Sequence, residues 1–113
     1  MNMYYGSVTK FNFQPVENVE KGDIVWVVWN HYNNGDGGDT ATPTKVTKVY
    51  NDGNILHHRR GYDDLEFAWA KDIVAKTPDV PFDRIPYRTM KVSQIRKEID
   101  QNQFDARNKV EAN

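Results

Sequence analysis

The chain has 113 residues, a length that fits one domain. Its net charge is −1, so the chain as a whole is not a polyanion binder, and a nucleic-acid site would need a local basic patch. It contains no cysteine, which excludes disulfides, thiolate nucleophiles and zinc sites that use cysteine. No apolar run approaches the roughly 20 residues of a membrane span, and the N-terminus does not resemble a signal peptide. We therefore expect a cytoplasmic protein with no membrane association.

The N-terminal third predicts two strands joined by a turn. Residues 1–14 contain imperfectly alternating apolar side chains and are expected to form a strand that ends before Pro15. A turn is expected at 19–23, where Gly22 can adopt positive φ. Residues 24–29 give the strongest strand pattern, because all six are β-branched or aromatic. Because this strand is apolar on both faces, we expect both faces to be covered.

The middle of the chain predicts a long loop and a series of short strands. Residues 30–43 are polar and rich in glycine, which favours a surface loop. Strands are expected at 44–50 and 54–58, joined by the Asn51-Asp52-Gly53 turn. Residues 65–69 alternate between apolar and small or polar side chains, as in a half-buried strand. Residues 71–74 are expected to form a short terminal turn or bridge.

The C-terminal part predicts a strap and a helix. Prolines at 78, 81 and 86 exclude a regular helix and favour an extended strap over 77–89. Apolar side chains near helical spacing predict an amphipathic helix from 90 to about 107, followed by a frayed tail to 113. Its narrow stripe of Val92, Ile95 and Ile99 either packs back on the rest of the chain or meets a partner. The expected organisation is 1–76, 77–89 and 90–113.

Several short motifs follow one another between residues 20 and 75. They are Gly22-Asp23-Ile24-Val25-Trp26, Pro43, Val46 and Val49, Asp52-Gly53-Asn54-Ile55, Gly61, Leu65-Glu66-Phe67-Ala68 and Asp72-Ile73. This order resembles the Tudor, PWWP and chromo-barrel group of SH3-like barrels. The resemblance implies a mainly β fold, a small SH3/Tudor-like antiparallel barrel with a proline-rich strap and a C-terminal α-helix. It also implies recognition of a peptide, a methylated side chain or nucleic acid by aromatic residues at one end of the barrel.

The same resemblance has a departure, and a second family shows a similar order. Where a PWWP domain carries an aromatic-Pro-Ala step, this chain has Thr42-Pro43-Thr44, so one expected wall of an aromatic cage is missing. Residues 21–27, Gly37-Gly38, Pro43 and 51–54 are also similar in order to the MazF-type toxin endoribonucleases. That likeness implies RNA cleavage, but Thr42 stands where that family places an arginine.

Aromatic and basic residues supply the candidate binding site. By alternation, Trp26 or Trp29 is expected to point inward, and Trp69 is expected to pack over the barrel end. In the basic stretch 57–60, His57 and Arg59 share one face of a strand while His58 and Arg60 share the other, so one pair can face solvent beside Lys45 or Lys48. The alternative is a solvated strand end balanced by the acidic residues that follow it. The candidate binding residues are Trp29, Tyr32, Tyr50, His58, Arg59, Arg60, Tyr62 and Trp69.

No pattern predicts catalysis, a metal site or a cofactor. His57 and His58 point opposite ways on a strand, and no third ligand stands at suitable spacing. The loop at 33–39 lacks the closing glutamate of a calcium-binding loop, since Ala41 occupies that place. Ser7 and Ser93 have no histidine near them in the sequence.

The composition leaves three functional hypotheses open. The leading one is a non-enzymatic adaptor or inhibitor that binds another protein, a type of small chain common among phage-encoded accessory proteins. The second is a nucleic-acid-binding SH3-like domain that uses the basic and aromatic residues named above. The third is a MazF-like endoribonuclease.

Overall fold

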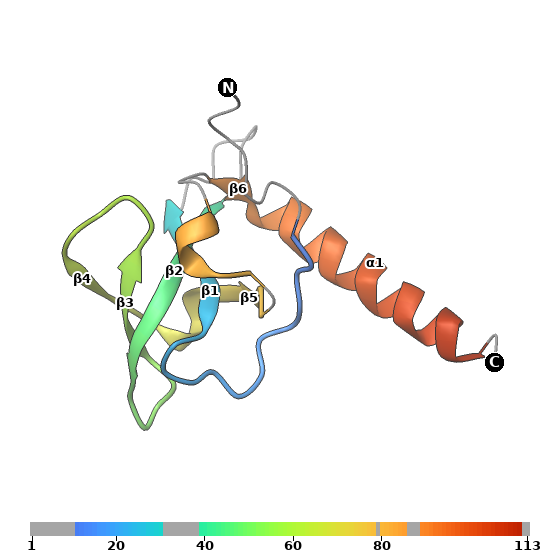
Figure 1. Ribbon diagram of the computed structural model, residues 1–113, viewed down its shortest axis with the longest axis horizontal. Helices are drawn as coiled ribbons and strands as arrows, with labels where there is room; N and C mark the ends of the chain where they lie inside the picture. The colour runs from blue at the N-terminus through green and yellow to red at the C-terminus, as the bar shows by residue number, and fades with distance from the viewer. Residues whose placement is uncertain (1–10, 31–38, 79, 86–88, 112–113) are drawn as a thin grey trace.

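The computed structural model describes residues 11–30, 39–78, 80–85 and 89–111. Within these residues, six antiparallel strands form one sheet, and one α-helix follows them (Figure 1). The elements are β1 (Ile24–Asn30), β2 (Thr40–Val49), β3 (Ile55–Arg59), β4 (Leu65–Ala68), the 3₁₀ turn η1 (Ala70–Asp72), β5 (Ile73–Lys76), the 3₁₀ turn η2 (Phe82–Arg84), β6 (Met90–Lys91) and α1 (Val92–Glu111). The prediction of a mainly β chain with a C-terminal helix is confirmed.

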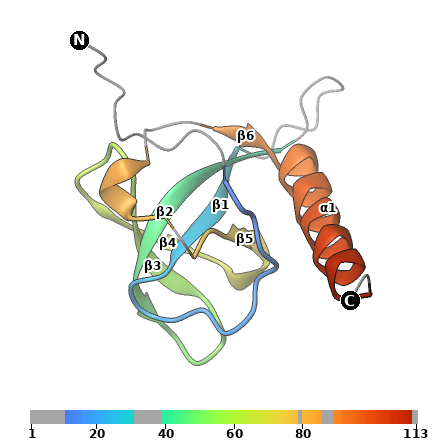
Figure 2. The same ribbon diagram turned by 45° about the vertical axis from the view of Figure 1, so that its right-hand side comes forward.

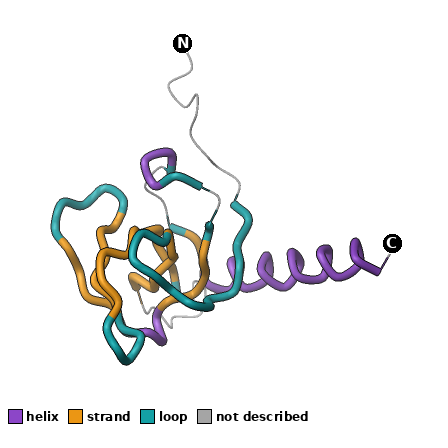
Figure 3. Tube along the Cα trace, turned by 60° about the horizontal axis from the view of Figure 1, so that its bottom comes forward, coloured by secondary structure: helices purple, strands orange, loops and turns teal. Residues whose placement is uncertain are grey.

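The sheet has the order β4-β3-β2-β1-β5, and β6 pairs with the start of β2. Strands β1 to β4 form a meander, because each pairs with the next. The chain then crosses through η1, and β5 pairs with β1. Within the described residues no ladder joins β4 to β5, so the sheet is open and these two strands are its ends. Figure 3 shows the strands gathered on one side of the molecule and α1 extending from them.

Both faces of β1 are buried, as the pattern of residues 24–29 predicts. On one face, which we call the helix face, Trp26 packs edge-on against Phe11 and Phe13 and is fully buried. On the opposite, inner face, Val25 and Val27 join a second cluster. That cluster also contains Val46, Ile55, Ala68 and Ile73. The sheet therefore carries two cores, one on each face.

Helix α1 covers part of the helix face, which settles the two alternatives for its apolar stripe in favour of packing on its own chain. Val92, Ile95 and Ile99 are buried in the same cluster as Trp26. The helix starts two residues later than predicted, because Met90 and Lys91 pair with β2, and it continues to Glu111 instead of fraying at 108. Figure 2 shows α1 beside the sheet, and Figure 1 shows its C-terminal half running beyond the sheet. Phe104 in that half is 56% exposed.

Two predicted boundaries near the N-terminus are wrong. Residues 1–10 lie outside the described part, and residues 11–14 form only an isolated bridge between Gln14 and Lys76, where a strand was expected. The loop expected over 30–43 ends earlier, because β2 begins at Thr40. Pro43 lies inside β2, opposite Trp26, and its carbonyl accepts a hydrogen bond from the backbone of Arg60. Tertiary pairing overrides the weak strand propensity of this segment.

Two predictions after residue 50 also need correction, whereas one turn is confirmed. Gly53 has a φ of 89° in the β2–β3 turn, the conformation for which the Asn51-Asp52-Gly53 pattern is suited. Residues 73–76 form the full strand β5, where a terminal turn or bridge was expected. The strap contains one 3₁₀ turn, η2, which follows Pro81. Residues 79 and 86–88 of the strap lie outside the described part.

Candidate functional site

Large apolar side chains are exposed where the sheet ends at β4. Leu65 is 54% exposed, Phe67 47% and Trp69 58%. The Phe67 ring contacts Trp69 edge-on, with 5.0 Å between ring centroids, and Tyr50 at 6.2 Å. We call these four residues, Tyr50, Leu65, Phe67 and Trp69, the aromatic edge. They continue the helix face, but α1 and the strap cover that face over other strands and leave it bare over β4.

The large side chains of the half-buried strand predicted at 65–69 lie on its solvent side. A half-buried strand normally turns its large apolar side chains inward. Here Ala68 is buried and Glu66 is partly covered on the inner face, while Leu65, Phe67 and Trp69 face outward. Trp69, which was expected to pack over a barrel end, is 58% exposed and borders a hollow of about 210 Å³ beside Val27 and Thr42 on the inner face of β1 and β2. A strand that presents its large side chains to solvent departs from the ordinary rule, and such departures concentrate at functional surfaces.

A buried ion pair explains why β4 has this orientation. Arg59 on β3 is 1% exposed, and its Nε and Nη2 each donate to a different oxygen of Glu66 at 2.8 Å. The Arg59 guanidinium also lies 3.7 Å from the centre of the Tyr62 ring. Burying Arg59 requires a carboxylate on the inner face. Because neighbouring residues of a strand point to opposite faces, placing Glu66 inside turns Leu65 and Phe67 outward.

A hydroxyl–imidazole pair lies beside this ion pair. Thr44 Oγ1 and His57 Nδ1 are hydrogen-bonded at 2.6 Å, and both side chains are buried. Burial lowers the pKa of His57 below its ordinary value, and the nearby Arg59 and His58 lower it further, whereas Glu66 acts in the opposite direction. The sequence gives no sign of this pair, since its members are far apart in the chain. Because it is enclosed, we interpret it as a satisfied polar contact of the inner core.

A hollow of about 400 Å³ adjoins the aromatic edge. Leu56 and Phe67 supply apolar surface from β3 and β4, and Tyr50 lies at its border. The β2–β3 turn closes the other side through Asn51, Asp52 and Asn54. Asp52 fixes this turn, because its two carboxylate oxygens accept from the backbone and side-chain amides of Asn54. The hollow is therefore lined by apolar side chains on the strand side and by polar residues on the turn side, which suits one apolar side chain of a ligand.

The basic stretch of residues 57–60 has the predicted alternation, and its side chains bond within the chain. Arg59 is held by Glu66 on the inner face. On the other face, the Arg60 guanidinium donates to the carbonyls of Ile85 at 2.5 Å and Asp83 at 3.3 Å, and so attaches the strap to β3. His58 Nε2 bonds to the Tyr62 carbonyl. These contacts use the groups that the nucleic-acid hypothesis assigns to phosphate.

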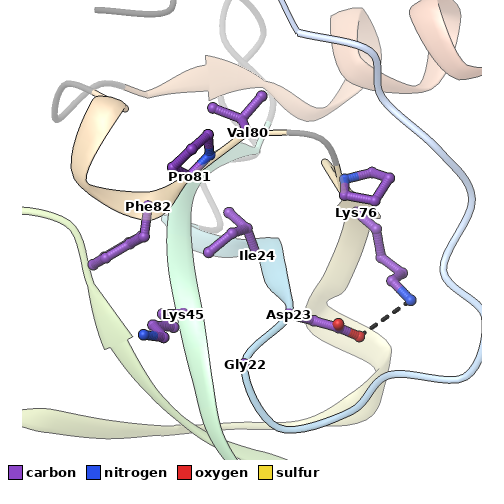
Figure 4. A pocket seen from close by; sticks show the side chains of 9 residues that line it. Gly22, Asp23, Ile24, Lys45, Lys76, Val80, Pro81 and Phe82 are labelled. Carbon is purple, nitrogen blue, oxygen red and sulfur yellow. Dashed lines mark ion pairs between the residues drawn. The ribbon is translucent and has the colours of Figure 1, made fainter.

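A second hollow, of about 380 Å³, lies under the strap (Figure 4). Asp23 and Lys76 form an ion pair across one side of it, with 3.1 Å between Oδ2 and Nζ. Lys45 and Phe82 stand on the opposite side. In the sheet, Lys45 lies opposite His58, and His58 lies opposite Leu65 of the aromatic edge. The strap residue Phe82 contacts the ring of His58.

The structure brings together only some of the predicted binding residues. Tyr50 and Trp69 belong to the aromatic edge, while Tyr62 lies against Arg59. Trp29 is in β1, but its side chain lies outside the described part, as does the whole of Tyr32. Leu65 and Phe67 were not among the predicted site residues. The signal that could have found them is the charged pattern of β3, which demands a carboxylate partner on the same face.

Three further observations bear on the class of the protein. Among the described residues no group of three potential metal ligands is found, and no helix there is long and apolar enough to cross a membrane. Comparison of the chain with protein families, with characterised proteins and with solved structures finds no significant match.

Proposed function

We propose that the chain is a non-enzymatic protein-binding module, acting as an adaptor or inhibitor, and that the aromatic edge is its contact surface. The observation that carries the proposal is the reversed orientation of β4, which exposes Leu65, Phe67 and Trp69. Tryptophan, tyrosine and other aromatic residues dominate the binding energy of protein interfaces. The partner would supply a short extended segment with apolar side chains at alternate positions, matching the spacing along β4.

The contact area supports a short segment better than a large globular face. An aromatic side chain buries about 150–250 Å² when it is fully enclosed. The half-exposed residues of the aromatic edge therefore leave on the order of 300–400 Å² uncovered. A standard protein interface buries about 800 Å² on each partner. The hollow beside Phe67 adds a place for one anchoring side chain of the segment.

We further propose that the sheet is the frame of an SH3-like barrel, which is the fold that the sequence resemblance implies. Support comes from the four-strand meander, the 3₁₀ turn after β4, and the return of β5 to pair with β1. The proposal concerns the type of fold only, since this type hosts many unrelated functions. It assigns no methyl-lysine cage, because Thr42 and Thr44 beside Pro43 are buried.

The test is selection of peptides from a random library displayed on phage, with the full chain as bait. We expect enriched sequences to contain apolar residues at alternate positions and to lose at least tenfold in affinity for a Phe67→Ser/Trp69→Ser variant. Phe104→Ser is the matched control, because Phe104 is equally exposed but lies on α1, away from the aromatic edge. Thermal melts of all three proteins check that the fold is kept.

The competing hypotheses are tested in the same experiment. Short single- and double-stranded DNA and RNA are titrated at two salt concentrations, since binding through phosphates weakens steeply with salt. Salt-dependent binding of nucleic acid without selection of any peptide would overturn the proposal. Cleavage of RNA by the wild-type chain would do the same and would favour the endoribonuclease hypothesis.

A further inference from the structure

We propose that the aromatic edge pairs with the aromatic edge of a second copy of this chain, forming an antiparallel β4–β4 ladder with Phe67 on the two-fold axis. This inference rests on the proposed function, because it concerns the same surface. The second copy occupies the aromatic edge when no target segment is bound. A target would then bind in competition with the second copy.

The outer side of β4 differs from the other ends of the sheet. At the β5 end, Gln14 and Lys76 exchange two backbone hydrogen bonds of 2.9 and 3.0 Å, so a preceding segment covers that edge. At the start of β2, the edge that β3 does not reach is paired with β6. In the part of the chain that the structure describes, only β3 pairs with β4. Figure 1 shows β4 at the margin of the molecule, with no labelled element beyond it.

Strand β4 lacks several of the devices that normally prevent edge-to-edge pairing. Proteins protect free edges with very short strands, lysine, proline, bulges or inward-pointing charges. Of these, β4 has a short length of four residues and one inward-pointing charge. Residues 65–68 include no lysine and no proline. The single charge, on Glu66, is bonded through both oxygens to Arg59 in the same chain. The register between β3 and β4 runs without a bulge. The edge is therefore suited to accept another strand.

Two identical strands related by a two-fold axis can pair antiparallel in only a few registers. With Glu66 on the axis, two like charges would lie opposite each other, which is unfavourable. With Ala68 on the axis, Leu65 would have no extended residue opposite it, because the other copy has entered η1 at that point. With Phe67 on the axis, Phe67 faces its own counterpart, Leu65 faces Trp69 of the second copy, and Glu66 faces the small Ala68. Only the last register places apolar against apolar along the whole edge.

Charges beyond the strand favour the same register. Asp63 and Asp64 precede β4 and are exposed, and Lys71 follows it and is exposed. With Phe67 on the axis, the chain of one copy leaves the ladder in η1 beside Asp63 and Asp64 of the other copy. Lys71 in that turn is exposed, whereas Asp72 after it is partly covered, so each end of the ladder brings an exposed positive charge near two negative charges.

The size of the interface predicts a reversible dimer. Each copy contributes less than the roughly 300–400 Å² of the whole aromatic edge, because Tyr50 follows β2 and lies away from the free side of β4, so the total stays well below the roughly 1,200 Å² of a stable complex. We therefore expect monomers at micromolar concentration and dimers as the concentration approaches the millimolar range. Such weak pairing is compatible with displacement by a target segment that also fills the hollow beside Phe67.

Disulfide trapping tests the register, since the chain has no cysteine of its own. Directly opposed residues of two strands lie about 4.5–5.5 Å apart between Cα atoms, within the range of a disulfide. On oxidation at high concentration, Phe67→Cys should form covalent dimers by itself. Leu65→Cys should form them only when mixed with Trp69→Cys, because four residues separate Leu65 from its own counterpart. Phe104→Cys is the control for random collision.

Sedimentation of the unmodified chain provides the second measurement, which does not depend on losing an aromatic ring. The wild-type sedimentation coefficient should rise between about 10 µM and 1 mM. Lys71→Glu should reduce this rise, and the Asp63→Lys/Lys71→Glu exchange should restore it. Wild-type chains that stay monomeric at 1 mM would overturn the inference, and trapping that peaks at Glu66→Cys or Ala68→Cys would overturn the register. If peptides are selected but the chain stays monomeric, the proposed function stands and the β4–β4 pairing is refuted. If dimers form but no peptide is selected, the β4–β4 pairing stands and the proposed function is refuted.

Discussion

Replacing Glu66 by alanine tests the interaction that orients the aromatic edge. The substitution removes the two Glu66 oxygens that accept from Arg59, whose side chain is 1% exposed, and leaves the positive charge inside the protein without this carboxylate. Breaking a buried ion pair in this way costs about 3–5 kcal/mol. The Glu66 side chain is 29% exposed, so water can reach part of the vacated space. We therefore expect a loss at or below the lower limit of that range, about 2–3 kcal/mol of the free energy of unfolding.

Urea denaturation followed by tryptophan fluorescence measures this loss. For a domain of this size, the same change should lower the melting temperature by roughly 8–12 °C. Asp64→Ala is the matched control, since Asp64 is an exposed carboxylate two residues earlier, and its removal should change stability by less than about 0.5 kcal/mol. An Arg59→Met/Glu66→Ala double variant should recover much of the loss, because it leaves no unpaired charge.

Two results would refute the reasoning. One is a Glu66→Ala protein that is as stable as the wild type, which would mean that the ion pair does not hold β4. The other is a double variant no more stable than the single one, which would mean that the loss has another origin than the unpaired charge of Arg59. Either result would also remove the physical reason given for the outward orientation of Leu65 and Phe67.

Three further predictions follow from the two cores and the strap. The pKa of His57 is lowered in the folded state, so below about pH 6.5 the unfolded chain binds more protons than the folded chain. The stability that comes from keeping His57 neutral is therefore fully present above that pH and is lost as the pH falls further. Urea unfolding between pH 7.5 and 5.5 should show the decrease in the free energy of unfolding, and His57→Gln should flatten it. Ile95→Ala, at a fully buried position on α1, should cost about 2–5 kcal/mol, whereas the exposed neighbour Gln94→Ala should cost less than about 0.5 kcal/mol in the same assay. Arg60→Ala should cost about 1–3 kcal/mol and speed hydrogen exchange at Ile85, because the guanidinium attaches the strap to β3; unchanged exchange there would contradict that role.

The local elements were largely accessible from the sequence. The six β-branched and aromatic residues at 24–29 strongly favour a strand, and because they are apolar on both faces the strand is covered on both. The sequence also predicts the turn at Asn51-Asp52-Gly53 and the apolar stripe of Val92, Ile95 and Ile99. These features depend on neighbours in the chain or on a short repeat, which is why composition and periodicity suffice to predict them.

The candidate site was decided by tertiary structure. Alternation at 65–69 is compatible with either face being buried, and hydrophobicity alone favours burying Leu65, Phe67 and Trp69. The choice depends on Arg59, which lies on another strand and needs a carboxylate beside it in the interior. Because the side chains of a strand alternate, one ion pair reverses the orientation of the whole of β4. The sequence by itself determines that strand 65–69 has a large-residue face, and the contact between β3 and β4 decides that this face is exposed to solvent.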